Sequence, residues 1–343
     1  MHRRRFLASL SSLAAIPLRA STPAQPLSWQ EPHMGTLWTI ETPGADPDIA
    51  AKAAKAAFSR IAALNTCLSD YLPDSELSRL SASSGLNKPV PVSSDLWTIL
   101  SKAQLAAASS NGLFDITLGP LTALWRRSRR QQKLPDAAVL AKARAASGWQ
   151  FLTLNPDNQS ALLRQPGMRL DAGGIAKGFA QDEALKVIAS HGITSALVNA
   201  GGEVGVSGPP PGRPAWLVQL QPIPGSPTPV AAVKSSFVAT SGDLHQFVEI
   251  DGRRFSHIID PATGLGMERP GHAVVIAPSG LSADVLATIL CLMGPSKGIP
   301  WLTKNHPDIQ ARISLTNPDG STETKASPGF SALLAPPPPA PAK

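Results

Sequence analysis

Cysteine is scarce in this chain of 343 residues, where it occurs at Cys67 and Cys291 alone. Two cysteines cannot build a CxxC metal site or a disulfide framework. A single bridge between them stays open, although Cys291 lies in an apolar run that favours a packed side chain. With 43% hydrophobic residues and a mean hydropathy near zero, the chain is neither wholly disordered nor a polytopic membrane protein. It is long enough for one large globular, soluble domain or two small ones.

Acidic residues are fewer than basic ones, and the imbalance is concentrated at the N-terminus. The chain has 31 Lys and Arg against 24 Asp and Glu, a formal charge of +7. Arg3, Arg4, Arg5 and Arg19 supply four of the positive charges, which leaves 27 basic against 24 acidic residues elsewhere. No run of basic and aromatic residues follows, so we expect no nucleic-acid partner.

A secretory signal is predicted over residues 1–24. Its charged start, Arg3–Arg5, precedes an apolar stretch, 6–18, that is shorter than the roughly 20 residues of a membrane-spanning helix. The segment Arg3–Leu7 resembles the twin-arginine export signal, with an ordinary secretory signal as the alternative. The signal leads us to expect a periplasmic protein, exported by the twin-arginine route. Because this segment lacks a cysteine, we expect no lipid anchor.

No proline-rich loop is long enough for a convincing domain linker, so we expect a single domain over 28–325, followed by a Pro/Ala-rich disordered tail over 326–343. Spacings of three and four residues indicate amphipathic helices, one of them capped by Ser93 or Ser94. The Asp-Gly pair at 251–252 indicates a hairpin turn. Helices mixed with consecutive strands predict an α+β fold with mixed or antiparallel sheets and packed helices. The expected helices are 49–64, 94–109, 136–147 and 282–293, and the expected strands are 196–199, 216–219, 237–240, 247–250, 254–259 and 272–277.

A glycine-rich turn, Asp171–Gly178, feeds a helical pattern and contains Lys177. Backbone N–H groups at a helix start attract anions, and the lysine could reach a phosphate. The glycine spacing matches neither a Walker A loop nor a dinucleotide fingerprint. A tight turn that caps a surface helix is the alternative. A second glycine turn, 199–203, allows either close backbone approach to a ligand or a plain turn.

Two residues of the later half are candidate proton acceptors. His257 ends a predicted strand, and the pKa of histidine lies near neutral pH, which suits a general base. A histidine held in a turn by a hydrogen bond is the alternative. Asp243, in the segment Thr240–Asp243, is a second candidate base.

Asp284 and Thr288 are four residues apart in a predicted helix, so they share one helix face. A carboxylate and a hydroxyl there can offer two oxygen ligands to Mg²⁺, and carbonyls, water or a substrate phosphate would complete the site. In the alternative, Asp284 serves the helix dipole and Thr288 bonds to its own turn.

These segments, taken in order, resemble the ApbE family of FAD:protein FMN transferases over about residues 34–314. Each is weak alone, and the match rests on eight of them in sequence. The landmarks are Met34–Thr36, Tyr71 with Asp74–Leu80, Phe114–Leu121, Asp171–Gly178, Asn199–Glu203, Thr240–Asp243, His257–Gly264 and Ala283–Thr288.

The resemblance implies an ApbE-like, T-fold-related architecture with FAD in a central cleft. It also implies an enzyme that cleaves the FAD pyrophosphate with Mg²⁺, transfers FMN to a threonine hydroxyl of a partner protein and releases AMP. By this resemblance, FAD is contacted by Met34, Tyr71, Leu113, Phe114, Asp115, Asp171, Lys177 and Ile259; Mg²⁺ is held by Asp284, Thr288 and the carbonyl of Gly174; and the base is His257 or Asp243.

The chain departs from the family pattern in one place that bears on the metal. Ala287 stands where some members have another carboxylate, which leaves fewer protein ligands. Two alternatives stay open: an FAD pyrophosphatase that releases FMN and AMP, and a periplasmic FAD-binding protein without turnover. The implied acceptor carries an Asp-Ser/Thr-x-x-Ser/Ala-Thr motif in a respiratory or electron-transfer subunit, with nitrous-oxide reductase maturation as one setting.

Overall fold

The computed structural model describes residues 27–336, apart from 224–225, 244–245 and 318. The predicted signal, 1–24, lies outside the described residues. Within them, every helix is too short or too polar to cross a bilayer.

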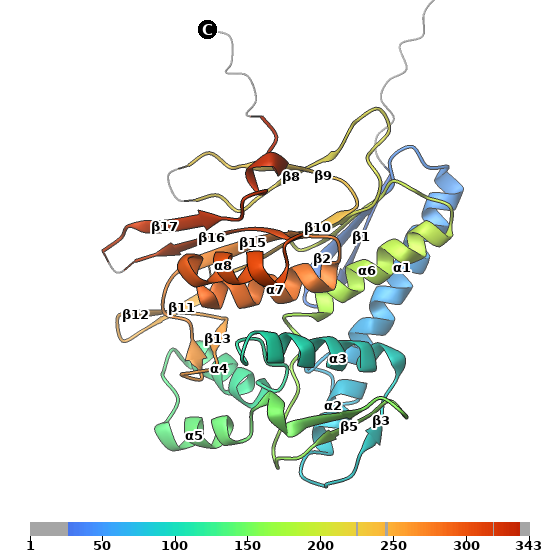
Figure 1. Cartoon of the computed structure of the whole chain (residues 1–343). Helices are drawn as coiled ribbons and strands as arrows, with labels where there is room; N and C mark the ends of the chain where they lie inside the picture. Colours follow the sequence, from blue (N-terminus) through green and yellow to red (C-terminus); the bar gives the residue numbers. More distant parts are fainter. Residues whose placement is uncertain (1–26, 224–225, 244–245, 318, 337–343) are drawn as a thin grey trace, which may run out of the picture.

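In the described part of the chain, eight antiparallel strands form the main sheet (Figure 1). Its neighbours follow one another in chain order, and each of the seven pairings is antiparallel. The predicted α+β class with antiparallel sheets is therefore confirmed. The strands, in spatial order, are β1 (Ser28–His33), β2 (Thr36–Glu41), β6 (Leu197–Ala200), β7 (Glu203–Val206), β10 (Ser236–Gly242), β15 (Gly271–Ala277), β16 (Gln310–Thr316) and β17 (Thr322–Ala326).

Four helices cover one face of this sheet: α1 (Pro47–Leu68), α6 (Ala176–Ser190), α7 (Gly280–Met293) and α8 (Pro295–Asn305) (Figure 1). α1 begins where Asp46 accepts hydrogen bonds from the N–H groups of Asp48 and Ile49. Its buried residues recur every three or four positions, as the sequence predicted. The core under this face takes its side chains from the helices and from alternate positions of the strands.

The opposite face of the sheet is closed by a hairpin of β8 (Trp216–Gln219) and β9 (Val230–Val233), together with the end of the described chain. Phe330 is 2% exposed and packs in this second core cluster. Leu334 forms a bridge with Ala231 of β9. The expected disordered tail from residue 326 is therefore wrong for its first part, because an aromatic anchor holds this segment on the sheet.

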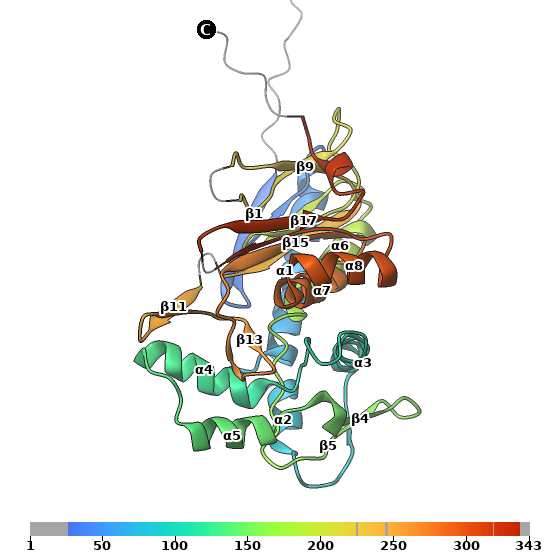
Figure 2. The same ribbon diagram turned by 60° about the vertical axis from the view of Figure 1, so that its left-hand side comes forward.

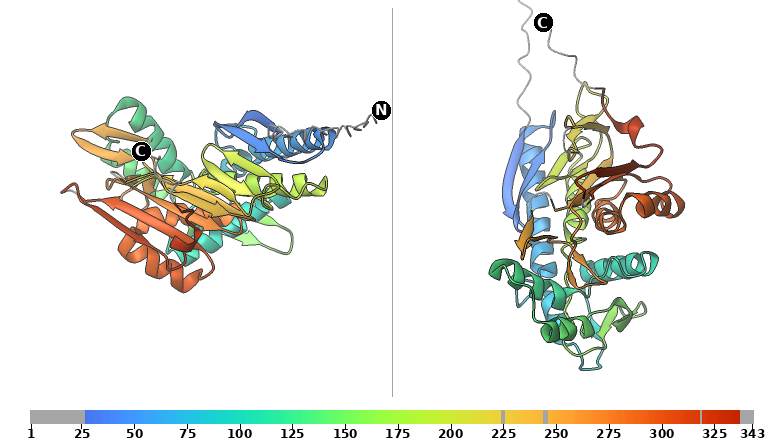
Figure 3. Two further views of the ribbon diagram at one scale, coloured as in Figure 1. Left: turned by 90° about the horizontal axis from the view of Figure 1, so that it is seen from above. Right: turned by 90° about the vertical axis from the view of Figure 1, so that its left-hand side faces the viewer.

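A second lobe lies below the helices (Figure 2; Figure 3, right). Its predicted hairpin is confirmed, with Asp251 and Gly252 both at positive φ in the turn. The second strand ends at Ser256, before the predicted end at residue 259, and the chain then turns into β13 (Ile259–Asp260). The lobe contains α2 (Glu76–Ala82), α3 (Ser94–Ser109), α4 (Gly119–Gln131), α5 (Ala137–Ala145), β3 (Val90–Pro91), β4 (Leu152–Asn155), β5 (Ser160–Leu163), β11 (Phe247–Ile250), β12 (Arg253–Ser256), β13 (Ile259–Asp260) and β14 (Leu265–Gly266).

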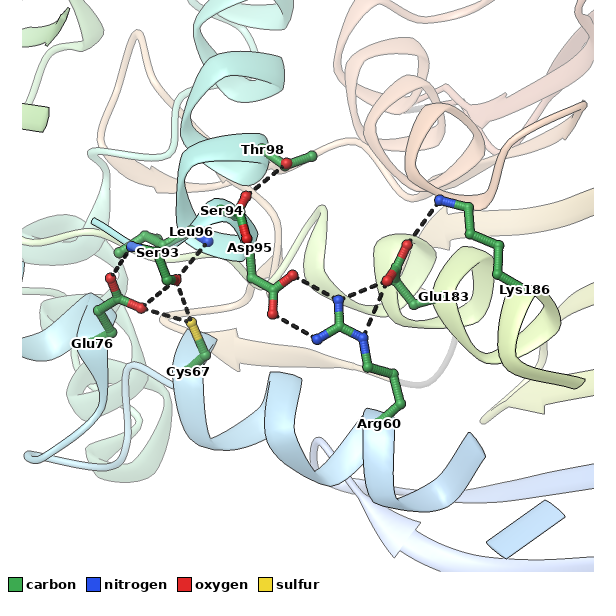
Figure 4. Close-up of polar contacts among 10 residues, drawn as sticks. All are labelled: Arg60, Cys67, Glu76, Ser93, Ser94, Asp95, Leu96, Thr98, Glu183 and Lys186. Atoms are coloured by element: carbon green, nitrogen blue, oxygen red, sulfur yellow. Dashed lines mark hydrogen bonds and ion pairs between the residues drawn. The ribbon is translucent and has the colours of Figure 1, made fainter. Parts of the chain in front are cut away.

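An ion-pair network joins the two parts (Figure 4). Arg60 of α1 donates from both terminal nitrogens to the two carboxylate oxygens of Asp95 in α3, each at 2.6 Å. The same guanidinium donates to Glu183 Oε2 of α6 at 2.6 and 3.1 Å, and Lys186 Nζ reaches Glu183 Oε1 at 2.8 Å. The hydrogen bond with Asp95 is the main cause of a raised pKa at Arg60, against the effect of burial. The bidentate pair of Arg60 with Asp95 fixes direction as well as distance, so it sets α3 against α1. The bonds to Glu183 join α6 to the same arginine.

Candidate active site

Two glycines allow the first turns of α6 and α7 to touch. A Cβ atom on Gly178 would lie 2.1 Å from the carbonyl oxygen of Gly280, and one on Gly280 would lie 2.4 Å from the carbonyl oxygen of Gly178. Both obstacles are backbone atoms, so a side chain at either position would push the helices apart. The glycine-rich turn of the sequence therefore serves close helix packing, and this packing brings Lys177 next to α7.

Each of these helices supplies a carboxylate to the start of the other. Asp182 of α6 accepts hydrogen bonds from the backbone N–H of Gly280 at 2.8 Å and of Leu281 at 3.0 Å. Asp284 of α7 accepts a hydrogen bond from the backbone N–H of Gly178 at 3.1 Å. Helix starts carry unsatisfied N–H groups and partial positive charge, which both carboxylates neutralise. Asp284 therefore caps α6, in addition to its expected role as a metal ligand.

Lys177 lies between two buried carboxylates. Its Nζ is 2.8 Å from Glu203 Oε1 and 3.9 Å from Asp284 Oδ2. Burial alone would lower the pKa of Lys177, but the charges of Asp284 and Glu203 outweigh it and keep the ammonium protonated. Burial and the charge of Asp284 raise the pKa of Glu203 to about 7, against the effect of Lys177. The second oxygen of Glu203, Oε2, is buried without a hydrogen-bond partner among the described residues.

Oxygen atoms gather beside Asp284. Thr288 Oγ1 is one turn along the same helix face and lies 3.1 Å from Ser241 Oγ of β10. Gly174 is close by, since a Cβ atom on it would lie 3.4 Å from Thr288 Oγ1 and 3.2 Å from Phe114 Cε2. The structure therefore brings together the three residues expected to hold Mg²⁺. Within the described residues, no group of three or more His, Cys, Asp or Glu side chains is placed to hold a metal.

Asp171 is tied to the second lobe by an arginine. Arg126 of α4 approaches Asp171 Oδ2 at 3.3 Å and also pairs with Asp70. Asp171 Oδ1 accepts a hydrogen bond from the N–H of Gly173 at 2.8 Å, which shapes the glycine-rich turn. Burial and the charge of Asp171 raise the pKa of Asp70 despite Arg126. The expected ligand residue Asp171 is thus held by the turn on one side and by α4 on the other.

The expected FAD residues of the segment 113–115 differ in their surroundings. Phe114 is buried against Gly174, whereas Leu113 is half-buried beside it. Asp115 borders a pocket of about 270 Å³, and both of its carboxylate oxygens are used, by Thr117 and by the N–H of Trp149. Burial raises the pKa of Asp115, which these hydrogen bonds oppose. Asp115 therefore holds its loop in shape.

One ring nitrogen of His257, Nδ1, has a hydrogen-bond partner among the described residues, and Nε2 has none there. Its Nδ1 lies 3.2 Å from the carbonyl oxygen of Gln246, and because a carbonyl only accepts, Nδ1 carries the proton. Burial lowers the pKa of His257; the charges of Arg129 and Lys177 lower it further, and Asp243 opposes them. The imidazole is therefore neutral at neutral pH, with Nε2 as the proton acceptor.

Asp243 does not fit the role of a second base. It is 2% exposed, and both carboxylate oxygens are occupied at 2.9 Å, Oδ2 by Arg254 Nε and Oδ1 by the N–H of Gly271. Arg254 also donates to the carbonyl oxygen of Asp243 at 3.0 Å. Both oxygens are thus engaged, one by an arginine and one by a backbone N–H, so we assign Asp243 to the fold.

Three other expected contacts lie around this centre. Met34 occupies the β1–β2 turn at φ 49°, and the neighbouring Thr36 lies against the second glycine turn, 2.2 Å from where a Cβ atom of Gly201 would be. Tyr71 is 72% exposed, with Arg126 Cζ 4.2 Å from its ring centroid. Ile259 is buried in a cluster around Trp125 and Phe255, so its side chain serves the core. Its contact with FAD stays a prediction.

Four polar residues of this centre had no role in the sequence prediction: Glu203, Ser241, Arg126 and Asp70. Glu203 and Ser241 stand inside segments that the sequence singled out, and a buried acid after a glycine pair was a usable signal. Arg126 and Asp70 gave no such signal, because Arg126 is 45 residues from Asp171 in the chain and Asp70 is farther still.

The fold is that of the flavin transferases. It is similar to the flavin transferase ApbE from Vibrio cholerae, with a TM-score of 0.81, 29% sequence identity, and coverage of 91% of this chain and all of that one. It is also similar to the Pseudomonas stutzeri flavinyl transferase ApbE in its apo form, with a TM-score of 0.79, 27% identity, and coverage of 90% and 97%.

The sequence comparisons give the family. The ApbE family model matches residues 34–313, so the chain belongs to the ApbE family. An FAD:protein FMN transferase of Escherichia coli (strain K12) is 32% identical over 309 residues, 88% of this chain and 87% of that protein. An FAD:protein FMN transferase of Vibrio cholerae is 30% identical over 339 residues, 96% and 99% of the two chains.

Proposed function

We propose that this protein is an FAD:protein FMN transferase. The observation that carries the proposal is Lys177, held between Glu203 and Asp284 at the touching starts of α6 and α7. The lysine ammonium, together with a divalent cation bound at Asp284, would gather positive charge in one place, which suits a pyrophosphate. The curated relatives carry this activity in their names, and they match most of the chain.

The reaction breaks one P–O bond of the FAD pyrophosphate and forms a P–O bond to a threonine hydroxyl. His257 Nε2 accepts the threonine proton as the oxygen attacks the phosphorus of the FMN half, and AMP leaves with the electron pair of the broken bond. Phosphoryl transfer depends mainly on positioning and on neutralised charge. Lys177 supplies the positive charge, and the Gln246 carbonyl keeps the imidazole in the right tautomer.

The residues beside Asp284 fit a hard divalent cation. A carboxylate, the hydroxyl of Thr288 and the carbonyl of Gly174 are all oxygen donors, which Mg²⁺ prefers. Bound there, Mg²⁺ would neutralise pyrophosphate charge. The protein offers few ligands, with Ala287 in place of a further carboxylate, so the substrate phosphates would complete the shell.

Incubation with FAD, MgCl₂ and a threonine peptide tests the proposal. The peptide contains the motif Asp-Ser-x-x-Ala-Thr, and its control has valine in place of the final threonine. We expect a covalently fluorescent peptide and one AMP per FMN transferred, with neither product on the control. AMP with free FMN would indicate the pyrophosphatase, and FAD binding without AMP would indicate a binding protein.

The acceptor and the compartment are part of the same proposal. The acceptor is a respiratory or electron-transfer subunit that carries the motif, and an adjacent gene encoding it would support this. The start Arg3–Leu7 supports export to the periplasm by the twin-arginine route. Fractionation of cells, with and without a functional twin-arginine translocase, tests the route.

A further inference from the structure

A pocket of about 640 Å³ lies between α4 and the β11–β12 hairpin, and it shares Tyr71 and Arg126 with the site described above. Figure 2 shows β11 directly above α4. Two exposed aromatic rings border it, Tyr71 and Phe247, and each has a guanidinium stacked on it, from Arg126 at 4.2 Å and Arg254 at 3.4 Å. The remaining lining residues are Arg129, Arg130, Gln132, Val248 and Glu249.

Among the described residues, the arginines of this pocket carry more positive charge than the neighbouring acidic residues offset. Arg126, Arg129 and Arg130 have the spacing i, i+3, i+4, so they share one face of α4, where like charges repel each other. Arg126 has acidic partners in Asp70 and Asp171. Arg129 and Arg130 form no ion pair with any acidic residue in the described ranges. Glu249 is the acid that lines the pocket, and it does not balance them.

The pocket opens beside the proposed base. Phe247 is paired with Ser256 in the hairpin, and the next residue, His257, donates its backbone N–H to the carbonyl oxygen of Gln246 at 3.0 Å. Partial burial and the charge of Arg126 lower the pKa of Arg129, and Tyr71 opposes them. An anion bound in the pocket would offset both the burial of the Arg129 guanidinium and its repulsion by Arg126. The proposed pyrophosphate site has its own cation in Lys177, so Arg129 and Arg130 can face another anion.

We propose that this pocket binds an acidic segment of the acceptor protein, next to the threonine that receives FMN. The inference rests on the proposed transferase activity. A threonine within reach of His257 brings its flanking residues across the surface formed by Phe247 and α4. Carboxylates in that flank meet Arg129 and Arg130, and extended peptide backbone and side chains pack on the exposed rings.

Two peptides of equal length test this inference, one with glutamates flanking the acceptor threonine motif and one with glutamines. The protein variants are the double substitution Arg129→Gln/Arg130→Gln and the control Arg127→Gln, which removes one positive charge from the exposed side of α4. FMN transfer at varied peptide concentration gives the KM for each peptide, and FMN transfer at varied FAD concentration gives the KM for FAD.

For the unmodified protein we expect the glutamate peptide to have a KM about three- to tenfold lower than the glutamine peptide, with the difference shrinking as salt is added. The double variant should lose this preference with an unchanged KM for FAD, and Arg127→Gln should keep it. Equal KM values for both peptides would overturn the inference alone. So would a double variant that raises the KM for FAD, since the pocket would then serve the nucleotide. AMP release without transfer to either peptide would overturn the proposed function and this inference together.

Discussion

Asp182 and Asp284 cap each other's helices: Asp182 accepts from the N–H groups that open α7, and Asp284 accepts from an N–H that opens α6. The two carboxylates are therefore equivalent for the fold and different for chemistry. Asp284 alone of the two lies 3.9 Å from Lys177 and one helical turn from Thr288. This pair separates the contribution of a cap from that of a site.

Asp284→Asn should keep a folded protein and lose Mg²⁺-dependent AMP release. The amide oxygen can still accept from the N–H of Gly178, whereas the negative charge that faces Lys177 is gone. Asp182→Ala should instead cost about 1 kcal/mol of stability through the lost cap and leave turnover much less affected. Urea unfolding and AMP release, measured on both variants, check the assignment. Equal turnover in Asp284→Asn and the unmodified protein would refute a ligand role for Asp284.

Gly280→Ala should disrupt the contact between α6 and α7. Its Cβ atom would lie 2.4 Å from a backbone oxygen of Gly178, which cannot rotate away, so we expect a loss of roughly 1–3 kcal/mol or more and weaker FAD binding. Ser282→Ala, in the same helical turn, is the control and should change little. Denaturant unfolding and FAD titration give the two quantities. If Gly280→Ala binds FAD as tightly as Ser282→Ala, the close approach is not needed for the site.

His257→Asn should lower kcat for FMN transfer by about 10²–10⁴-fold while FAD binding stays near its original strength. The pKa of His257 is lowered, so the base is already unprotonated at neutral pH. The transfer rate of the unmodified protein should therefore increase with pH in the range below 6.5 and be constant around neutral pH. A pH–rate profile with a parallel FAD titration measures both. Loss of FAD binding in step with kcat would show that His257 is a ligand contact and not the base.

His272 predicts a loss of stability in mild acid. Burial, with the charge of Arg312, lowers its pKa to about 4, so the unfolded chain binds the proton first as the pH falls. Stability from this residue is complete above about pH 6.5 and is lost as the pH falls towards 4, by roughly 3 kcal/mol at most. Urea unfolding between pH 4 and 7 should show this slope, and His272→Leu should flatten it. The same slope in His272→Leu would assign the effect to other groups.

The sequence predicted those elements whose causes are local. α1 and α3 follow from caps and apolar spacing, and the β11–β12 turn follows from one Asp-Gly pair. Arg126 meeting Asp171 depends on how whole elements pack, which spacing along the chain does not encode. Phe330 falls in the predicted disordered tail, which is rich in proline and alanine. Its one buried ring nevertheless holds the segment against the sheet.

The pairing of β2 with β6 has a kinetic consequence. Trp38 lies opposite Ala200, so the chain from α1 to α6, which includes α2–α5 and the small sheet of β3–β5, forms one long insertion between two adjacent strands. Closing so long a loop costs conformational entropy before any strand contact repays it. We expect the lobe to gain structure first and the β2–β6 ladder to close late. Lys177 and Glu203 stand on either side of β6, so ligand binding should appear only with that last closure.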